Sequence, residues 1–148
     1  MRALFFTVLA VAVALSPVAP VAAGETAPPS YRVIVHPSNP LPSVDRRFIS
    51  DAFLKKVKSW PNGEAIRPAD LRLRDGTRKE FSKGVLGRSV DAIKAYWQQQ
   101  IFSGRDVPPP ELEDESKVVA FVLKHPGAVG YVSGAVSIGG SKVVPIAR

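Results

Sequence analysis

Hydrophobic positions follow two different periods along the chain, and their succession predicts a mixed α/β domain. Residues 31–35 alternate and end in β-branched side chains, which is typical of a strand. Residues 128–132 and 143–146 are short apolar runs that also predict strands. Residues 65–73 form a further extended segment, in which Pro68 predicts either an edge strand or a break.

Four stretches carry apolar side chains at helical spacing and predict helices over residues 44–56, 77–86, 90–102 and 113–125. Ser43 and Ser89 are the expected N-caps of the first and third helices. Thr77 and Glu80 match a capping box at the start of the second. The predicted order is strand, helix, strand, three helices and two strands. Strands separated by helices indicate an α/β fold with a mixed sheet.

Several aromatic side chains raise the question of a stacking platform, namely Trp60, Tyr96, Trp97 and Phe102. Aromatic residues at helical spacing more often belong to a hydrophobic core. We therefore expect these side chains to be buried.

The residues before the first predicted strand have the features of a secretory signal peptide. Arg2 precedes a short apolar run over residues 3–15, and small residues over 21–23 fit a cleavage site. The apolar run is shorter than the ~20 residues that a membrane-spanning helix needs. We expect residues 1–23 to be cleaved, residues 24–30 to form a flexible lead-in, and residues 31–148 to form a periplasmic domain.

The composition narrows the classes of partner. The chain has 20 Lys and Arg, 13 Asp and Glu, a formal net charge of +7 and no cysteine. A positive balance favours anionic ligands or acidic partners, while attraction to a membrane surface and simple solubility remain alternatives. Nucleic acid fits poorly, because the chain is expected to be exported and its charges are scattered. Without cysteine there is no disulfide framework and no thiolate metal site, and we expect neither a metal nor a cofactor.

Enzyme signatures are missing from the sequence. The segment around Ser133 lacks the spacing of a nucleophile elbow. The two histidines, His36 and His125, lie far apart and have no carboxylate at ligand spacing. A capping or helix-dipole role suits both residues better than catalysis. We therefore expect no enzymatic activity and no catalytic residues.

One segment has a physical reason to bind an anion. Gly76 and Thr77 are expected to open a helix, whose N-terminus presents unpaired amides and the positive end of the helix dipole. Arg72, Arg74, Arg78 and Lys79 would surround the anion with positive charge, and an arginine binds an oxyanion bidentately. Asp75 would accept a hydrogen bond from a protonated oxyanion, which favours phosphate over sulfate.

Ordinary helix capping explains the same segment without a ligand. If Glu80 closes the capping box, its carboxylate takes one of the donors and adds negative charge beside the anion. A solvated basic rim around a capped helix then accounts for every residue, so both interpretations stay open.

Four segments together resemble the phosphate-binding component of ATP-driven phosphate importers: residues 33–40, 48–63, 74–77 and 126–132. The last, Pro-Gly-Ala-Val-Gly-Tyr-Val, is similar to the Pro-Gly-Ala-Ile-Gly-Tyr strand of that family. Arg74-Asp75-Gly76-Thr77 resembles its Arg, Asp, Ser-Gly-Thr anion loop, shortened by the serine and its neighbour. The resemblance implies one lobe of a type II periplasmic-binding-protein-like fold, a mixed β-sheet flanked by helices, whose second lobe has no counterpart in these residues.

The resemblance also implies a function. It points to an exported phosphate ABC transporter substrate-binding-like protein that weakly binds inorganic phosphate or a similar oxyanion at Arg74, Asp75, Gly76, Thr77 and Arg78. An ABC transporter permease would be its protein partner. Three alternatives stay open: a non-catalytic periplasmic interaction module that keeps the fold without the ligand site, a homodimer that rebuilds a cleft, and an unrecognised enzyme.

Overall fold

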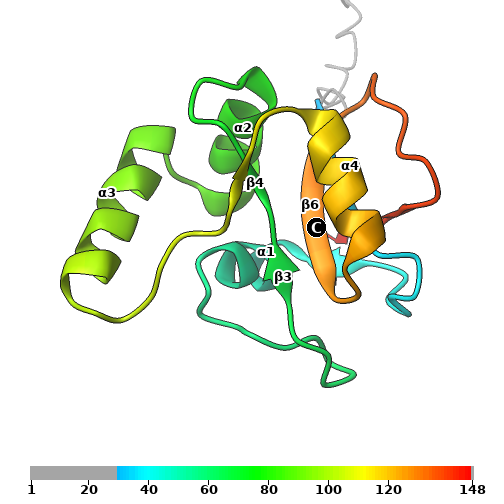
Figure 1. Cartoon of the computed structure of the whole chain (residues 1–148), viewed down its shortest axis with the longest axis horizontal. Helices are drawn as coiled ribbons and strands as arrows, with labels where there is room; N and C mark the ends of the chain where they lie inside the picture. Colours follow the sequence, from blue (N-terminus) through cyan, green and yellow to red (C-terminus); the bar gives the residue numbers. More distant parts are fainter. Residues whose placement is uncertain (1–29, 148) are drawn as a thin grey trace, which may run out of the picture.

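The computed structural model describes residues 30–147, whose centre is a mixed sheet with the strand order β3-β6-β1-β7 (Figure 1). The expected signal peptide and nearly all of the expected lead-in lie outside the described residues. Among the residues that are described, no helix is both long and apolar enough to cross a membrane.

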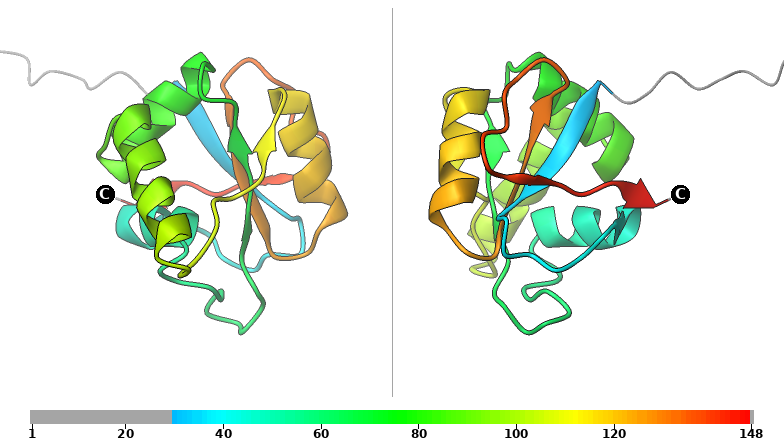
Figure 2. Two further views of the ribbon diagram at one scale, coloured as in Figure 1. Left: turned by 60° about the vertical axis from the view of Figure 1, so that its left-hand side comes forward. Right: turned by 90° about the vertical axis from the view of Figure 1, so that its right-hand side faces the viewer.

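Two predicted strands form the middle of this sheet. Strand β1 (Tyr31–Val35) runs antiparallel to β6 (Ala128–Ser133), with Tyr31 opposite Ser133 and Val35 opposite Val129. Helix α4 covers one face of the two strands, and α1 and α2 lie on the other (Figure 2). Apolar residues on both faces of the strands are therefore buried, which explains the nearly continuous apolar sequence of β6.

The outer strands are short. Strand β3 (Arg67–Pro68) pairs parallel to β6 at one edge, and β7 (Lys142–Val143) pairs antiparallel to β1 at the other. The extended segment over 65–73 is thus broken, and β4 (Asp70–Leu71) pairs with β5 (Glu111–Leu112) in a separate two-stranded sheet.

The helices agree with the predicted order, and their bounds differ at some ends. They are α1 (Arg46–Phe53), α2 (Gly76–Phe81), α3 (Val90–Phe102) and α4 (Glu115–Lys124). Helix α2 continues into a π-helical turn, η1 (Ser82–Leu86), which ends at Gly87 with a φ of 66°. Ser89 caps α3 as predicted, because its side chain accepts a hydrogen bond from the amide of Ala92.

The expected cap of the first helix is wrong. Asp45, not Ser43, accepts hydrogen bonds from the amides of Arg47 and Phe48. Val44 is held outside the helix, because β2 (Val44–Asp45) pairs parallel to β8 (Ile146–Ala147). The helix also ends at Phe53 and not near Lys56, and Lys55 follows with a φ of 54°.

The single C-terminal strand predicted over 143–146 is divided. Lys142 and Val143 pair with β1, whereas Ile146 and Ala147 pair with β2 in a different sheet. Between them the Pro145 carbonyl accepts a hydrogen bond from the Val44 amide. The apolar run over residues 143–146 therefore contributes strands to two different sheets.

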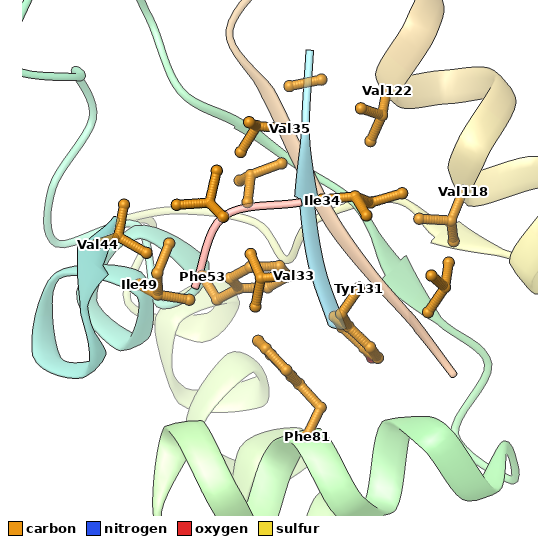
Figure 3. Close-up of a cluster of buried hydrophobic side chains, with 14 of the residues drawn as sticks. Val33, Ile34, Val35, Val44, Ile49, Phe53, Phe81, Val118, Val122 and Tyr131 are labelled. Atoms are coloured by element: carbon orange, nitrogen blue, oxygen red, sulfur yellow. The ribbon is translucent and has the colours of Figure 1, made fainter. Parts of the chain in front are cut away.

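The hydrophobic core lies on both faces of β1 and β6 (Figure 3). Ile34 faces Val118 and Val122 of α4, and on the opposite face Phe81 and Tyr131 stack with ring centroids 3.8 Å apart. The close approach of α4 requires Gly130, because a Cβ there would lie 2.5 Å from a methyl group of Val118.

The aromatic residues divide between core and surface. Trp60 and Trp97 are buried as expected, and the Trp60 indole donates to the Gly127 carbonyl across 2.9 Å. Tyr96 is only partly buried. Phe102 is 90% exposed, so its predicted burial is wrong. Helix α3 ends there and leaves that side chain beyond the small cluster of Leu54, Ile93 and Trp97.

Candidate functional site

The start of helix α2 is capped by the residue before it. The carboxylate of Asp75 accepts hydrogen bonds from the amides of Thr77 at 2.8 Å and Arg78 at 3.2 Å. The predicted capping box of Thr77 and Glu80 is therefore wrong, because Gly76 and Thr77 are already helical and Asp75 holds the N-cap position. Two of the amides that an anion would use already bond to a carboxylate of the chain itself.

The side chain of Thr77 points to a second internal carboxylate. Its hydroxyl donates to Oε1 of Glu115 across 2.6 Å. The same carboxylate accepts from the Ser133 amide and the Ser133 hydroxyl, each at 2.8 Å. Glu115 is the first residue of α4 and Ser133 the last of β6, so this carboxylate joins three elements of the fold.

Arg78 belongs to a buried charge cluster. Its side chain is 5% exposed, with Nη2 3.1 Å from Oδ2 of Asp70 and Nη1 2.7 Å from Oε1 of Glu111. It also donates to the carbonyl of Leu71. Its guanidinium therefore pairs with the buried carboxylate of Asp70 and with the more exposed carboxylate of Glu111.

Asp70 is the second centre of this cluster. It accepts hydrogen bonds from the Tyr131 hydroxyl and, at 2.9 Å, from the Leu71 amide. Burial raises the pKa of the Asp70 carboxyl, and Arg78 offsets part of that rise. Burial, together with the neighbouring Asp70, also raises the pKa of Tyr131, so its hydroxyl remains a proton donor.

Three of the predicted site residues line an open groove of about 970 Å³ between α2, η1 and the start of α3. These three are Arg74, Asp75 and Gly76. Five cationic side chains and two carboxylates line the groove, namely Arg74, Lys79, Lys83, Arg88 and Lys94 with Asp75 and Asp91.

The groove cations have little internal compensation. Within residues 30–147, none of the five forms an ion pair with a carboxylate. Both capping hydrogen bonds of Asp75 go to Oδ1, and no described donor bonds to its Oδ2. The groove therefore offers several cationic donors and two carboxylates, Asp75 and Asp91, to a ligand.

The sequence indicated only part of this groove. The structure brings Arg74, Asp75, Gly76 and Lys79 to it. Arg72 instead pairs with Glu113, and the side chains of Thr77 and Arg78 bond to partners outside the groove. Lys83, Arg88 and Lys94 were missed, because they follow the anion-loop motif on other elements. The spacing of four residues between Lys79 and Lys83 was the available signal for one side of the groove.

The two histidines do not form a site together. Nδ1 of His36 lies 2.6 Å from the Ser38 hydroxyl, and Nδ1 of His125 lies 2.9 Å from the Phe121 carbonyl at the end of α4. In the described part of the chain, no group of three or more histidine or acidic side chains is arranged to hold a metal ion.

The arrangement of sheet and helices has the fold of the phosphate-binding proteins of ABC transporters, as predicted for a single lobe. An ABC-type phosphate transport receptor from Vibrio cholerae has a TM-score of 0.58 and 17% identity to the chain, covering 78% of this chain and 45% of its own.

Two further solved structures match the chain to a similar extent. A protein from Clostridium perfringens, described as a phosphate ABC transporter substrate-binding protein and solved with bound phosphate, has a TM-score of 0.61 and 17% identity. The match covers 79% of this chain and 44% of that protein. PstS from Borrelia burgdorferi has a TM-score of 0.60 and 9% identity, covering 79% and 47%.

The chain thus spans less than half the length of these structures. No protein-family model and no curated protein matches the sequence. At this level of identity the comparisons establish the fold.

Proposed function

We propose that this chain is an exported phosphate-transport substrate-binding-like protein that weakly binds inorganic phosphate or a similar oxyanion. The ligand lies in the groove beside Arg74, Asp75 and Gly76, with Thr77 and Arg78 holding the loop from behind. The observation that carries this proposal is the convergence of five cationic side chains on one open groove at the anion-loop motif.

Three groove residues have roles set by their chemistry. The Arg74 guanidinium binds two oxygens of the anion, and Lys79 adds charge from the next turn of α2. Oδ2 of Asp75 accepts a hydrogen bond from the hydroxyl of a protonated phosphate, whereas sulfate has no proton to donate at neutral pH. Because the groove is open to water, binding is weak and decreases with ionic strength.

The proposal also includes a role for this chain in phosphate transport. The resembling solved structures carry phosphate-transport names, and the chain has the fold of less than half of such a protein. Export of the domain, a periplasmic location and docking on an ABC transporter permease complete the proposed role.

Calorimetry with inorganic phosphate tests the proposed site. We expect saturable heat with a dissociation constant of about 1 mM, no matching heat from sulfate at equal ionic strength, and a loss of about tenfold in Arg74→Ala. Arg72→Ala is the matched control, because Arg72 lies outside the groove lining and pairs with Glu113 at 2.8 Å. No saturable heat, or equal heats for both anions, contradicts the proposal.

A second candidate is an interaction module that keeps the fold without a ligand. It is favoured by one observation: Asp75 and Glu115 already occupy donors at the start of α2. The same calorimetry separates the two candidates, because this module gives no saturable phosphate heat.

A further inference from the structure

Helix α3 carries an exposed apolar tip. Phe102 is 90% exposed and Ile101 51% exposed at the end of the helix, and Val107 is 59% exposed in the connection that follows. In Figure 1, α3 lies at the outer side of the molecule, away from α4. An aromatic side chain exposed to this degree costs solvation free energy unless another surface covers it.

The apolar tip and the basic groove lie on the same side of α3. Lys94 lines the groove, and Gln98 and Ile101 follow it at spacings of four and three residues. Residues at these spacings share one side of a helix, and Phe102 is four residues beyond Gln98. The helix from Val90 to Phe102 is about 18 Å long, so one continuous surface joins cations at one end to apolar side chains at the other.

The positive charge on this surface favours an anionic partner. Arg88 and Lys94 line the groove end of the surface, and Arg105 follows the apolar tip. A second copy of the chain would bring the same positive charge against it. A stable protein interface also buries about 1,200–2,000 Å² with close shape complementarity, and three apolar side chains at one helix end do not provide that area. An anionic lipid bilayer offers phosphates to the cations and accepts an aromatic side chain without a preformed pocket.

We propose that this side of α3 is a docking surface for an anionic membrane. Phe102 and Ile101 enter the boundary between headgroups and acyl chains, while the cations around Arg88 and Lys94 contact lipid phosphates. The docking rests on the apolar tip together with the groove cations, and it goes beyond the binding of free phosphate proposed above.

Co-sedimentation with lipid vesicles tests the docking surface. We expect the purified protein to bind vesicles of phosphatidylglycerol and phosphatidylethanolamine about tenfold more tightly than vesicles of phosphatidylcholine. Phe102→Ser should weaken binding to the anionic vesicles about tenfold, and Lys94→Gln should weaken it less. Leu123→Ser is the matched control, because Leu123 is 38% exposed on α4 and belongs to a different surface.

Fluorescence of Phe102→Trp tests insertion directly. Trp60 and Trp97 are buried and report little change, so the difference spectrum belongs to the new side chain. We expect its emission to shift to shorter wavelength on anionic vesicles and to be quenched by brominated acyl chains.

Several outcomes overturn the proposal. These are equal binding to neutral and anionic vesicles, full binding by Phe102→Ser, or an unchanged emission of Phe102→Trp. A dimer in sedimentation velocity that disappears in Phe102→Ser assigns the surface to a second copy instead. The phosphate-binding proposal is tested independently, because Phe102→Ser should leave the heat of phosphate binding unchanged.

Discussion

The hydroxyl of Thr77 donates to the carboxylate of Glu115 across 2.6 Å, although the two residues are 38 positions apart in the chain. This hydrogen bond joins the starts of α2 and α4. The threonine that the sequence motif assigned to an anion therefore bonds to an acidic side chain of the same molecule. The contribution of the Thr77 hydroxyl to stability can be measured separately from any contribution to ligand binding.

Replacing Thr77 tests this separation. Thr77→Val removes the donor and should lower the free energy of unfolding by about 1.5 kcal/mol, since hydrogen bonds to charged groups are the stronger ones. Thr77→Ser keeps the hydroxyl and should lose clearly less. Urea denaturation measures both values. Equal losses in the two variants would mean that the hydroxyl does not account for the loss. An altered phosphate heat in Thr77→Val would give the hydroxyl a role in ligand binding.

Replacing Arg74 and Arg78 should have very different effects on the free energy of unfolding. Arg78→Ala leaves the buried Asp70 carboxylate without its cation and should cost about 3–5 kcal/mol of stability. Arg74→Ala removes a groove side chain that forms no ion pair with any carboxylate of the described residues, and it should change stability by less than about 0.5 kcal/mol. Chemical denaturation compares them. A large loss in Arg74→Ala would mean that the groove edge supports the fold.

Asp70 should make stability depend on pH in an unusual direction. Burial raises its folded-state pKa above the unfolded value, so the folded state binds the proton more tightly. The resulting stabilisation is complete below the unfolded pKa of about 3.9 and is lost as the pH rises through the folded pKa.

The Asp70→Asn variant isolates this effect from other carboxyl groups. The free energy of unfolding of the wild type minus that of the variant should fall with rising pH above about 4 and then become constant. Denaturation between acidic and neutral pH gives this difference. A difference that rises with pH would mean that Arg78 outweighs burial and lowers the pKa.

Gly127 should tolerate no side chain. Its φ is 77°, and a Cβ there would meet the carbonyl oxygen of Ala65. Gly63 has a φ of 86° but open space around it, so Gly63→Ala isolates the backbone cost of about 1–2 kcal/mol. Thermal unfolding should show a clearly larger loss in Gly127→Ala. Equal losses would mean that the segment around Ala65 moves aside at little cost.

Much of the fold was predictable because its signals are local. The alternating residues of β1, the apolar run of β6 and the Ser89 cap are each determined within a few neighbouring positions. The division between β7 and β8 was not predictable in this way, because it depends on pairing of Val44 with Ile146 across the whole domain.

The site was harder to predict because its contacts connect distant residues. The sequence contains two overlapping signals at the start of α2, and the carboxylate of Asp75 holds the cap in place of the Thr77 hydroxyl. The partners of Arg78 include Glu111, which lies 33 positions later. Nothing near Arg78 in the sequence shows that its charge is neutralised in the interior.

The small cluster beneath α3 has a consequence for motion. Only Leu54, Ile93 and Trp97 form its buried centre, separate from the main core. Fewer buried contacts mean a smaller free energy of local opening, so amide protons of α3 should exchange with solvent long before those of β6. Helix α3 is then a unit that can detach while the sheet stays folded, and native-state hydrogen exchange would detect it as a cooperative unit that opens before β6.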